Sequence, residues 1–145
     1  MAMKLEVDKY PSFKATTALS APGLCVKLSR EGVVTKTNPG DAPFGVALKA
    51  TEDPFNPGTY VANQYVPVAC YGIVELQLYT GNKTITAGDR LETASKGMVD
   101  KFVSFAGATP SVAEAKKIVG IALEDVASST GGTIKALLDI DHRWG

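Results

Sequence analysis

The sequence is poor in the residues that most often carry catalysis or bind metal ions. Among 145 residues it has one histidine, His142, and two cysteines, Cys25 and Cys70. A histidine base needs a nucleophile or a carboxylate held beside it, and two cysteines without a nearby histidine do not form a zinc site. The P-loop, the dinucleotide-binding glycine pattern and the Gly-x-Ser-x-Gly elbow are absent from the sequence. We therefore expect a protein that is not an enzyme, with no catalytic residues, no cofactor and no metal.

The sequence also lacks an excess of charge of either sign. The 15 Lys and Arg residues balance the 15 Asp and Glu residues, so the formal net charge is zero. Binding to nucleic acid requires a basic surface, so we expect no nucleic-acid partner. No apolar run approaches the roughly 18 residues of a transmembrane helix, and the first residues lack the apolar segment of a signal peptide, so we expect no membrane partner. A net charge near zero favours association between protein molecules.

Both cysteines lie in apolar surroundings. Cys25 stands between Leu24 and Val26, and Cys70 stands between Ala69 and Tyr71. A free cysteine in such a run behaves as a small hydrophobic residue. We expect buried free thiols, and the sequence leaves open whether the two cysteines are paired.

Glycine and proline are plentiful, with 14 and 8 residues, and they recur as turn signals such as Pro22-Gly23 and Pro39-Gly40. The segments between the turns are short and rich in Val, Ile, Thr and Tyr. This pattern predicts an all-β fold, a compact β-tulip-like barrel or sandwich. The apolar run at residues 66–79 is long enough for two strands or for one strand with a bend at Gly72. Residues 111–117 are expected to form either a short helix or a loop. The expected strands are residues 14–19, 24–29, 33–37, 45–50, 60–61, 66–79, 90–93, 98–102, 118–125 and 133–140.

An internal repeat is the most informative feature of the sequence. The separation from Gly23 to Gly32 equals that from Gly88 to Gly97 (32 − 23 and 97 − 88, both 9). Each unit continues into a Gly-x-Ala-Leu strand, at residues 45–48 and 120–123. A second copy of a β-unit can cover the apolar face and the sheet edges of the first. We expect one β-domain at residues 14–145, built from pseudo-repeats at about 19–79 and 80–140.

The two ends of the sequence lie outside the repeat. We expect residues 1–13 to form an extended N-terminal arm, because polar and apolar side chains roughly alternate in it. Such an arm can add a strand to an exposed sheet edge of a partner, and a frayed or self-packed terminus is the alternative. The C-terminal tail carries the only tryptophan, which either covers the domain's own core or anchors an interface. The expected partner-binding residues are Leu5, Val7, Tyr10, Phe13 and Trp144.

Acidic and aromatic residues leave two other functions open. Paired carboxylates can serve acid–base chemistry or bind a cation, and a small enzyme on a β-clip-like barrel would use Glu52, Asp53, Glu124 and Asp125. The alternative is that these residues are polar strand ends on the surface. Residues 128–132 are either a backbone cradle for an anion or a hairpin connection. Exposed tyrosines would suit a carbohydrate- or receptor-binding module of a fibre or tail, with the candidates Tyr60, Tyr65, Tyr71 and Tyr79.

Five segments share a pattern in which glycine turns alternate with apolar strands. They are residues 23–34, 45–48, 88–99, 118–123 and 131–138. Together they resemble the head decoration, or capsid cement, proteins of tailed bacteriophages. The resemblance implies a β-rich body, usually a homotrimer, bound to the outside of an icosahedral capsid. There it would bridge neighbouring major capsid proteins after the shell expands. It also implies a location on the virion surface after synthesis in the host cytoplasm. The longer N-terminal arm and the tail with Trp144 depart from the family's pattern.

Overall fold

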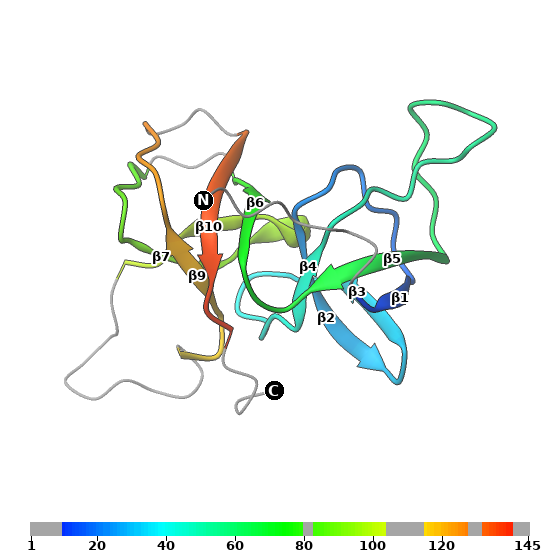
Figure 1. The fold of residues 1–145 in the computed structure, drawn as a ribbon, viewed down its shortest axis with the longest axis horizontal. Helices are drawn as coiled ribbons and strands as arrows, with labels where there is room; N and C mark the ends of the chain where they lie inside the picture. The colour runs from blue at the N-terminus through cyan, green and yellow to red at the C-terminus, as the bar shows by residue number, and fades with distance from the viewer. Residues whose placement is uncertain (1–9, 80–82, 104–114, 128–131, 141–145) are drawn as a thin grey trace.

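The computed structural model describes residues 10–79, 83–103, 115–127 and 132–140. Their regular structure is almost entirely β, which confirms the predicted all-β class. The strands form a closed five-stranded barrel and a second five-stranded sheet beside it (Figure 1). A short 3-10 turn, η2 (Ser95–Gly97), precedes the eighth strand. In chain order the strands are β1 (Ser12–Ala15), β2 (Leu24–Arg30), β3 (Val33–Lys36), β4 (Gly45–Ala47), β5 (Gln64–Ala69), β6 (Ile73–Gln77), β7 (Arg90–Thr93), β8 (Val99–Lys101), β9 (Ile118–Ala122) and β10 (Thr133–Leu138).

The barrel has the strand order β1-β3-β2-β4-β5 and closes through β1. This strand runs antiparallel to β5, with Phe13 opposite Val66. It also runs parallel to β3, with Lys14 opposite Val33. Because β1 joins β3 to β5, the barrel presents no free strand edge to a partner chain.

The second sheet repeats the strand order of the barrel. Its order β6-β10-β9-β7-β8 corresponds, strand for strand, to β1-β5-β4-β2-β3. Both units contain one hairpin at an equivalent place, β2–β3 and β7–β8. The parallel pairing that closes the barrel is reduced in the second sheet to a single parallel bridge between Leu78 and Val99. The second unit is therefore an opened version of the first.

The observed strand order shifts the boundary between the two units. Residues 66–79 hold two strands, β5 and β6, with Gly72 at a φ of 100° in the turn between them. Since β6 pairs with β10, it belongs with the second unit, and not with the unit predicted at residues 19–79. The strand expected at residues 60–61 is a single bridge between Tyr60 and Glu52. The helix or loop expected at residues 111–117 lies mostly outside the described residues.

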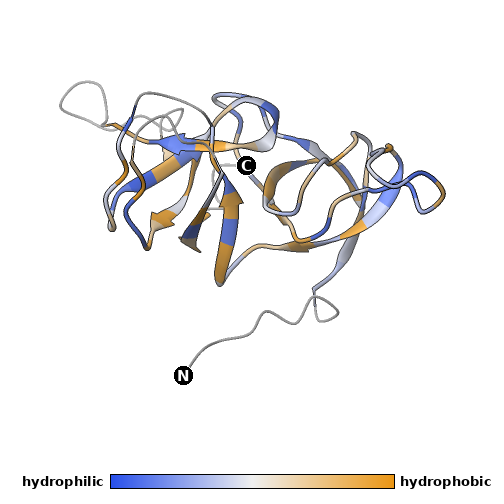
Figure 2. Cartoon of the chain, turned by 90° about the horizontal axis from the view of Figure 1, so that it is seen from above, coloured by the Kyte–Doolittle hydropathy of each residue, from blue (hydrophilic) through white to orange (hydrophobic). Residues whose placement is uncertain are grey.

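Alternating side chains build a hydrophobic core in each unit. In β10, Ile134 and Ala136 are buried while Lys135 and Leu137 are exposed, as in a sheet with one solvated face. Figure 2 shows the same alternation as hydrophobic and hydrophilic bands along the strands. The barrel core is built mainly from Leu19, Leu24, Val26, Val34, Val66 and Val68. The core of the second sheet is built mainly from Leu76, Ile85, Leu91, Val99, Val119 and Ile134, and Cys25, Val46 and Ala69 of the barrel extend it.

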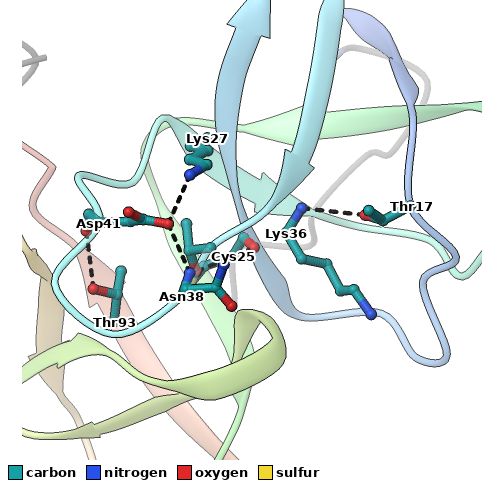
Figure 3. A network of polar contacts seen from close by, with 8 residues as sticks. Thr17, Cys25, Lys27, Lys36, Asn38, Asp41 and Thr93 are labelled. Carbon is teal, nitrogen blue, oxygen red and sulfur yellow. Dashed lines mark hydrogen bonds and ion pairs between the residues drawn. The ribbon is translucent and has the colours of Figure 1, made fainter.

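A network of polar contacts also ties the barrel to the second sheet (Figure 3). The carboxylate of Asp41 pairs with Lys27 at 2.9 Å and accepts the backbone N–H of Asn38 at 2.8 Å. Burial alone would raise the pKa of Asp41, but these contacts outweigh it and hold that pKa below its ordinary value. The backbone carbonyl of Asp41 accepts a hydrogen bond from the buried hydroxyl of Thr93 in β7 at 2.9 Å. The two units are thus held together by polar contacts as well as by shared core.

Candidate partner-binding surface

The structure places Phe13 inside the barrel strand β1. Its half-buried ring packs edge-on against Phe44, with the ring centroids 5.2 Å apart. The backbone around it is paired on both sides, to β3 and to β5. Phe13 therefore contributes to the barrel core, and β1 begins within the segment that was expected to be an arm.

Tyr10 lies at the start of the described chain and packs on the turn between β5 and β6. Its ring centroid is 5.9 Å from that of Tyr71, and its side chain packs against the core that the two units share. Burial, with a smaller contribution from Tyr71, raises the pKa of the Tyr10 hydroxyl. Leu5, Val7 and Trp144 lie outside the described residues, so their role in partner binding stays a prediction.

Phe55 is the most exposed large apolar side chain that the structure describes, with an exposed fraction of 89%. It lies in the turn closed by the hydrogen bond between Asp53 and Thr59, which we call the loop tip. This turn belongs to the long loop between β4 and β5, which projects from the barrel at the right of Figure 1. Tyr65 and Tyr71 follow at 70% each. Phe55 is not among the partner-binding residues predicted from the sequence. One sequence pattern does indicate that Phe55 is exposed on a turn. It is a single aromatic residue within a cluster of turn-forming residues, Asp53-Pro54-Phe55-Asn56-Pro57-Gly58.

Hydrogen bonds fix the shape of the loop tip. The carboxylate of Asp53 accepts the backbone N–H of Phe55 at 2.9 Å and the side-chain amide of Asn56 at 3.3 Å. The backbone N–H of Asp53 donates to the carbonyl of Thr59 at 2.8 Å, which closes the turn. Gly58 completes it at a φ of +87°, where side chains are strained. Phe55 therefore stands on a turn that is ordered before any partner binds.

The base of the same loop is anchored in the barrel. The hydroxyl of the buried Thr51 accepts the backbone N–H of Leu19 at 2.8 Å, and its backbone N–H donates to the carbonyl of Leu19 at 2.9 Å. The carbonyl of Thr51 in turn accepts the N–H of Val61 on the returning arm of the loop at 2.9 Å. The loop is consequently tied to the barrel by hydrogen bonds at its base.

A shallow hollow of about 260 Å³ lies where the barrel meets the second sheet. Its apolar wall comes from Pro22, Leu48 and Val74, and its rim from Glu75, Gln77 and Thr133. The backbone N–H of Gln77 donates to the carbonyl of Gly23 at 3.0 Å, and the amide of Gln77 donates to the carbonyl of Pro22 at 2.9 Å. These bonds fix the two sides of the hollow relative to each other.

Of the four paired acidic residues, Asp53, Glu124 and Asp125 accept backbone N–H groups with their carboxylates. Glu124 accepts the backbone N–H of Lys135 at 2.9 Å, and Asp125 accepts that of Ala87 at 2.7 Å. Asp53 caps the loop tip, and the Glu52 carbonyl accepts a bond from Gln64 at 3.4 Å. Among the described residues, no group of three or more His, Cys, Asp and Glu residues could hold a metal ion. This geometry favours the interpretation of the acidic pairs as polar strand ends.

The candidate tyrosines lie on four separate segments. Tyr60 is in the projecting loop, Tyr65 is in β5, Tyr71 is in the turn before β6, and Tyr79 follows β6. Within the part of the chain that the structure describes, the one ring contact that includes any of them is that of Tyr71 with Tyr10. Among the described residues, no two of these four tyrosines are in ring contact with each other.

Both cysteines are free thiols. Cys25 is fully buried, and burial raises the pKa of its thiol to about 12. Cys70 is half-buried, and burial raises its pKa as well. The raised pKa values make both thiols poor nucleophiles. His142 and most of the glycine-rich loop at residues 128–132 lie outside the described residues. In the described part of the chain, no helix has the length and apolar character to cross a membrane.

No family model and no curated protein matches the sequence. Among solved structures, the chain is similar to the N base of the head fibre gp8.5 of bacteriophage phi29. The TM-score is 0.55, the sequence identity is 14%, and the match covers 90% of this chain and 96% of that chain. A match that covers nearly the whole of both chains includes the barrel and the second sheet alike. At this identity, the finding is that the two proteins share a fold.

Proposed function

We propose that the chain is a structural protein attached to the outside of a bacteriophage head, where it binds the major capsid protein and bridges neighbouring copies of it. The observation that carries the proposal is the likeness to a head-fibre base over 90% of the chain. It agrees with the resemblance to head decoration proteins, which rests on separate evidence, the spacing of glycine turns in the sequence. The protein would act through contact surfaces and without catalysis.

Self-association is part of this proposal, with a homotrimer as the expected state. The zero net charge means that copies of the chain do not repel one another through their total charge. The projecting apolar tip at Phe55 supplies a contact that the isolated chain leaves unused. Many copies on a closed shell would also strengthen weak single contacts through effective concentration.

The proposal is tested on particles of the phage that encodes the chain. Particles lacking the chain are purified, mixed with the purified protein and sedimented, and the pellets are examined by electron microscopy. We expect the chain to sediment with the particles, to give density on the outer surface of the shell and to raise the temperature at which the particles rupture. A chain that is absent from native particles and does not sediment with empty capsids would overturn the proposal.

A second candidate function is the base of a longer appendage, and the match to the N base of a head fibre favours it. In that case the chain would attach a carbohydrate- or receptor-binding fibre to the head. Particles lacking the chain would then lose the fibre and adsorb poorly to host cells, while their shells would rupture at the same temperature as native ones. If the chain is instead a cement protein, particles lacking it should keep their fibres and adsorb normally, but their shells should rupture at a lower temperature.

A further inference from the structure

The loop tip and the hollow are complementary features of one chain. The tip presents a single phenyl ring, 89% exposed, on a turn that Asp53 holds in place. The hollow offers a volume of about 260 Å³ walled by Pro22, Leu48 and Val74. An apolar cavity of about 150 Å³ is enough to hold a benzene ring. The hollow therefore has room for the side chain of Phe55.

The two features lie on different parts of the molecule. Phe55 belongs to the loop between β4 and β5, which projects from the barrel (Figure 1). The hollow is lined in part by residues of β6 and β10. The exposure of Phe55 shows that it does not fill the hollow of its own chain. A contact between the tip of one molecule and the hollow of the next is heterologous, and a heterologous contact produces a ring where the rotation closes.

The charges around the hollow allow a second copy to approach. Glu75 is the one charged residue of its lining, and it lies directly opposite Lys135 in the pairing of β6 with β10. Gln77 and Thr133 complete the rim with neutral polar groups. On the tip, both oxygens of the Asp53 carboxylate are engaged in hydrogen bonds within the loop. The lining therefore holds one carboxylate, which has a lysine at the neighbouring strand position, and the tip carries a carboxylate that is already bonded within its own loop.

We propose that Phe55 of one copy inserts into the hollow formed by Pro22, Leu48 and Val74 of a neighbouring copy, so that the copies associate head to tail. This inference rests on the self-association included in the proposed function, and it names the contact that produces it. The hydrogen bonds of the tip favour this contact, because a loop backbone that is already held in one turn loses little conformational entropy on binding. Phe55 would be the energetic centre of the contact, since a buried aromatic residue in a pocket often dominates an interface.

The first test measures association in solution without capsids, by sedimentation velocity at micromolar concentrations. Phe55→Ser removes the ring, and Thr133→Trp places an indole on the exposed rim of the hollow. We expect each variant to raise the dissociation constant by about tenfold or more. Tyr65→Ser is the matched control, because it removes another exposed aromatic ring from the barrel, and it should leave the constant unchanged. A wild-type chain that is strictly monomeric, or variants that associate as well as wild type, would overturn the inference.

The second test locates the contact directly. The photoreactive analogue p-benzoylphenylalanine replaces Phe55, and isotopically labelled and unlabelled chains are mixed before irradiation. We expect cross-links between a labelled and an unlabelled chain, from position 55 to Pro22, Leu48 or Val74. Cross-links to any other surface would overturn the inference. A chain that forms the expected cross-link but does not bind capsids would leave this contact standing and would overturn the proposed function instead.

Discussion

The carboxylate of Asp53 accepts the backbone N–H of Phe55 at 2.9 Å, so the residue that fixes the backbone beneath the exposed ring lies two positions before it. The bond is an Asx-type turn, in which a side chain satisfies a backbone group that has no partner in a strand. One acidic residue that the sequence offered as a candidate for acid–base chemistry or cation binding is thus part of the scaffold of a projecting loop.

Replacing Asp53 should loosen this tip without unfolding the barrel. Asp53→Ala removes the acceptor for two hydrogen bonds at the surface, and each such bond contributes only about 0.5–1.5 kcal/mol to stability. We expect the amide of Phe55 to exchange its hydrogen faster while the amides of β5 stay protected, as measured by hydrogen exchange. Asp53→Asn keeps an acceptor oxygen and should exchange nearly as slowly as wild type. Equal exchange in all three proteins would show that the turn does not depend on this side chain.

Gly23 should be intolerant of any side chain. It has a φ of +91°, and a Cβ placed there would overlap the carbonyl oxygen of Glu75 in β6. We expect Gly23→Ala to lower the free energy of unfolding by about 1–3 kcal/mol or more, because it adds a steric clash to the backbone strain. Gly32→Ala is the matched control, since its φ is +71° but nothing lies within 4 Å of its added Cβ. Urea unfolding curves give the free energy of unfolding of both variants. If Gly23→Ala is as stable as Gly32→Ala, the close packing of the two units at Gly23 is contradicted.

The two faces of β10 should respond differently to truncation. Ile134→Ala opens a cavity in the core of the second sheet, and we expect a loss of about 2–5 kcal/mol in unfolding free energy. Leu137 is on the opposite, solvated face with an exposed fraction of 42%, and Leu137→Ala should change stability by about 0.5 kcal/mol or less. Thermal or urea unfolding distinguishes the two variants. Similar losses would mean that the exposed face of this sheet is covered in solution.

Stability should decline at alkaline pH through Cys25. Burial raises its pKa to about 12 in the folded state from an ordinary value of 9.0. The folded protein therefore keeps a proton that the unfolded chain loses. The contribution is fully present below pH 9.0 and is lost as the pH rises towards 12. In this range, the thiol of Cys25 should lower the free energy of unfolding by at most about 1.4 kcal/mol for each unit of pH.

Comparison with Cys25→Ala isolates this contribution, because the variant retains every other titrating group. Its unfolding free energy should be lower than that of wild type near neutral pH but should fall less steeply above pH 9. Parallel slopes would mean that the thiol titrates alike in the folded and unfolded chains. Thiol reagents give an independent readout, since Cys25 should react slowly in the folded protein and rapidly in urea.

The predicted arm requires a shorter truncation than the sequence suggested. Residues 12 and 13 pair with Pro67 and Val66, so deleting residues 2–13 removes part of β1 and should destabilise the barrel. Deleting residues 2–9 should leave the unfolding midpoint unchanged and weaken the binding of the protein to capsids. Sedimentation with capsids and a urea titration of both truncations check this expectation. If the shorter truncation binds capsids as tightly as the full chain, the arm has no role in attachment.

The fold class, nearly all the strands and the likeness between the two units could be predicted, because glycine turns and strand periodicity are local signals. The unit to which β6 belongs could not be predicted. The sequence indicates two strands or a bend at Gly72 within residues 66–79, but only the pairing with β10 shows which unit the second strand joins. The place of Phe13 within the barrel could not be predicted for the same reason. Its burial depends on β3, β5 and Phe44, which are distant in sequence. Phe55 was missed because exposure in a loop is a property of the whole fold.

The closure of the barrel through β1 has a consequence for how the protein folds. The hairpins β2–β3 and β7–β8 join neighbouring segments and can form early, whereas β1 must find β5, and β6 must find β10, across most of a unit. Such long-range pairing places an all-β chain among the slower folders, with times of about milliseconds to seconds. The first strand is therefore expected to be the last to join the barrel. Until it does, β3 and β5 are open edges, and the newly made chain is most vulnerable to pairing with the wrong molecule during that interval.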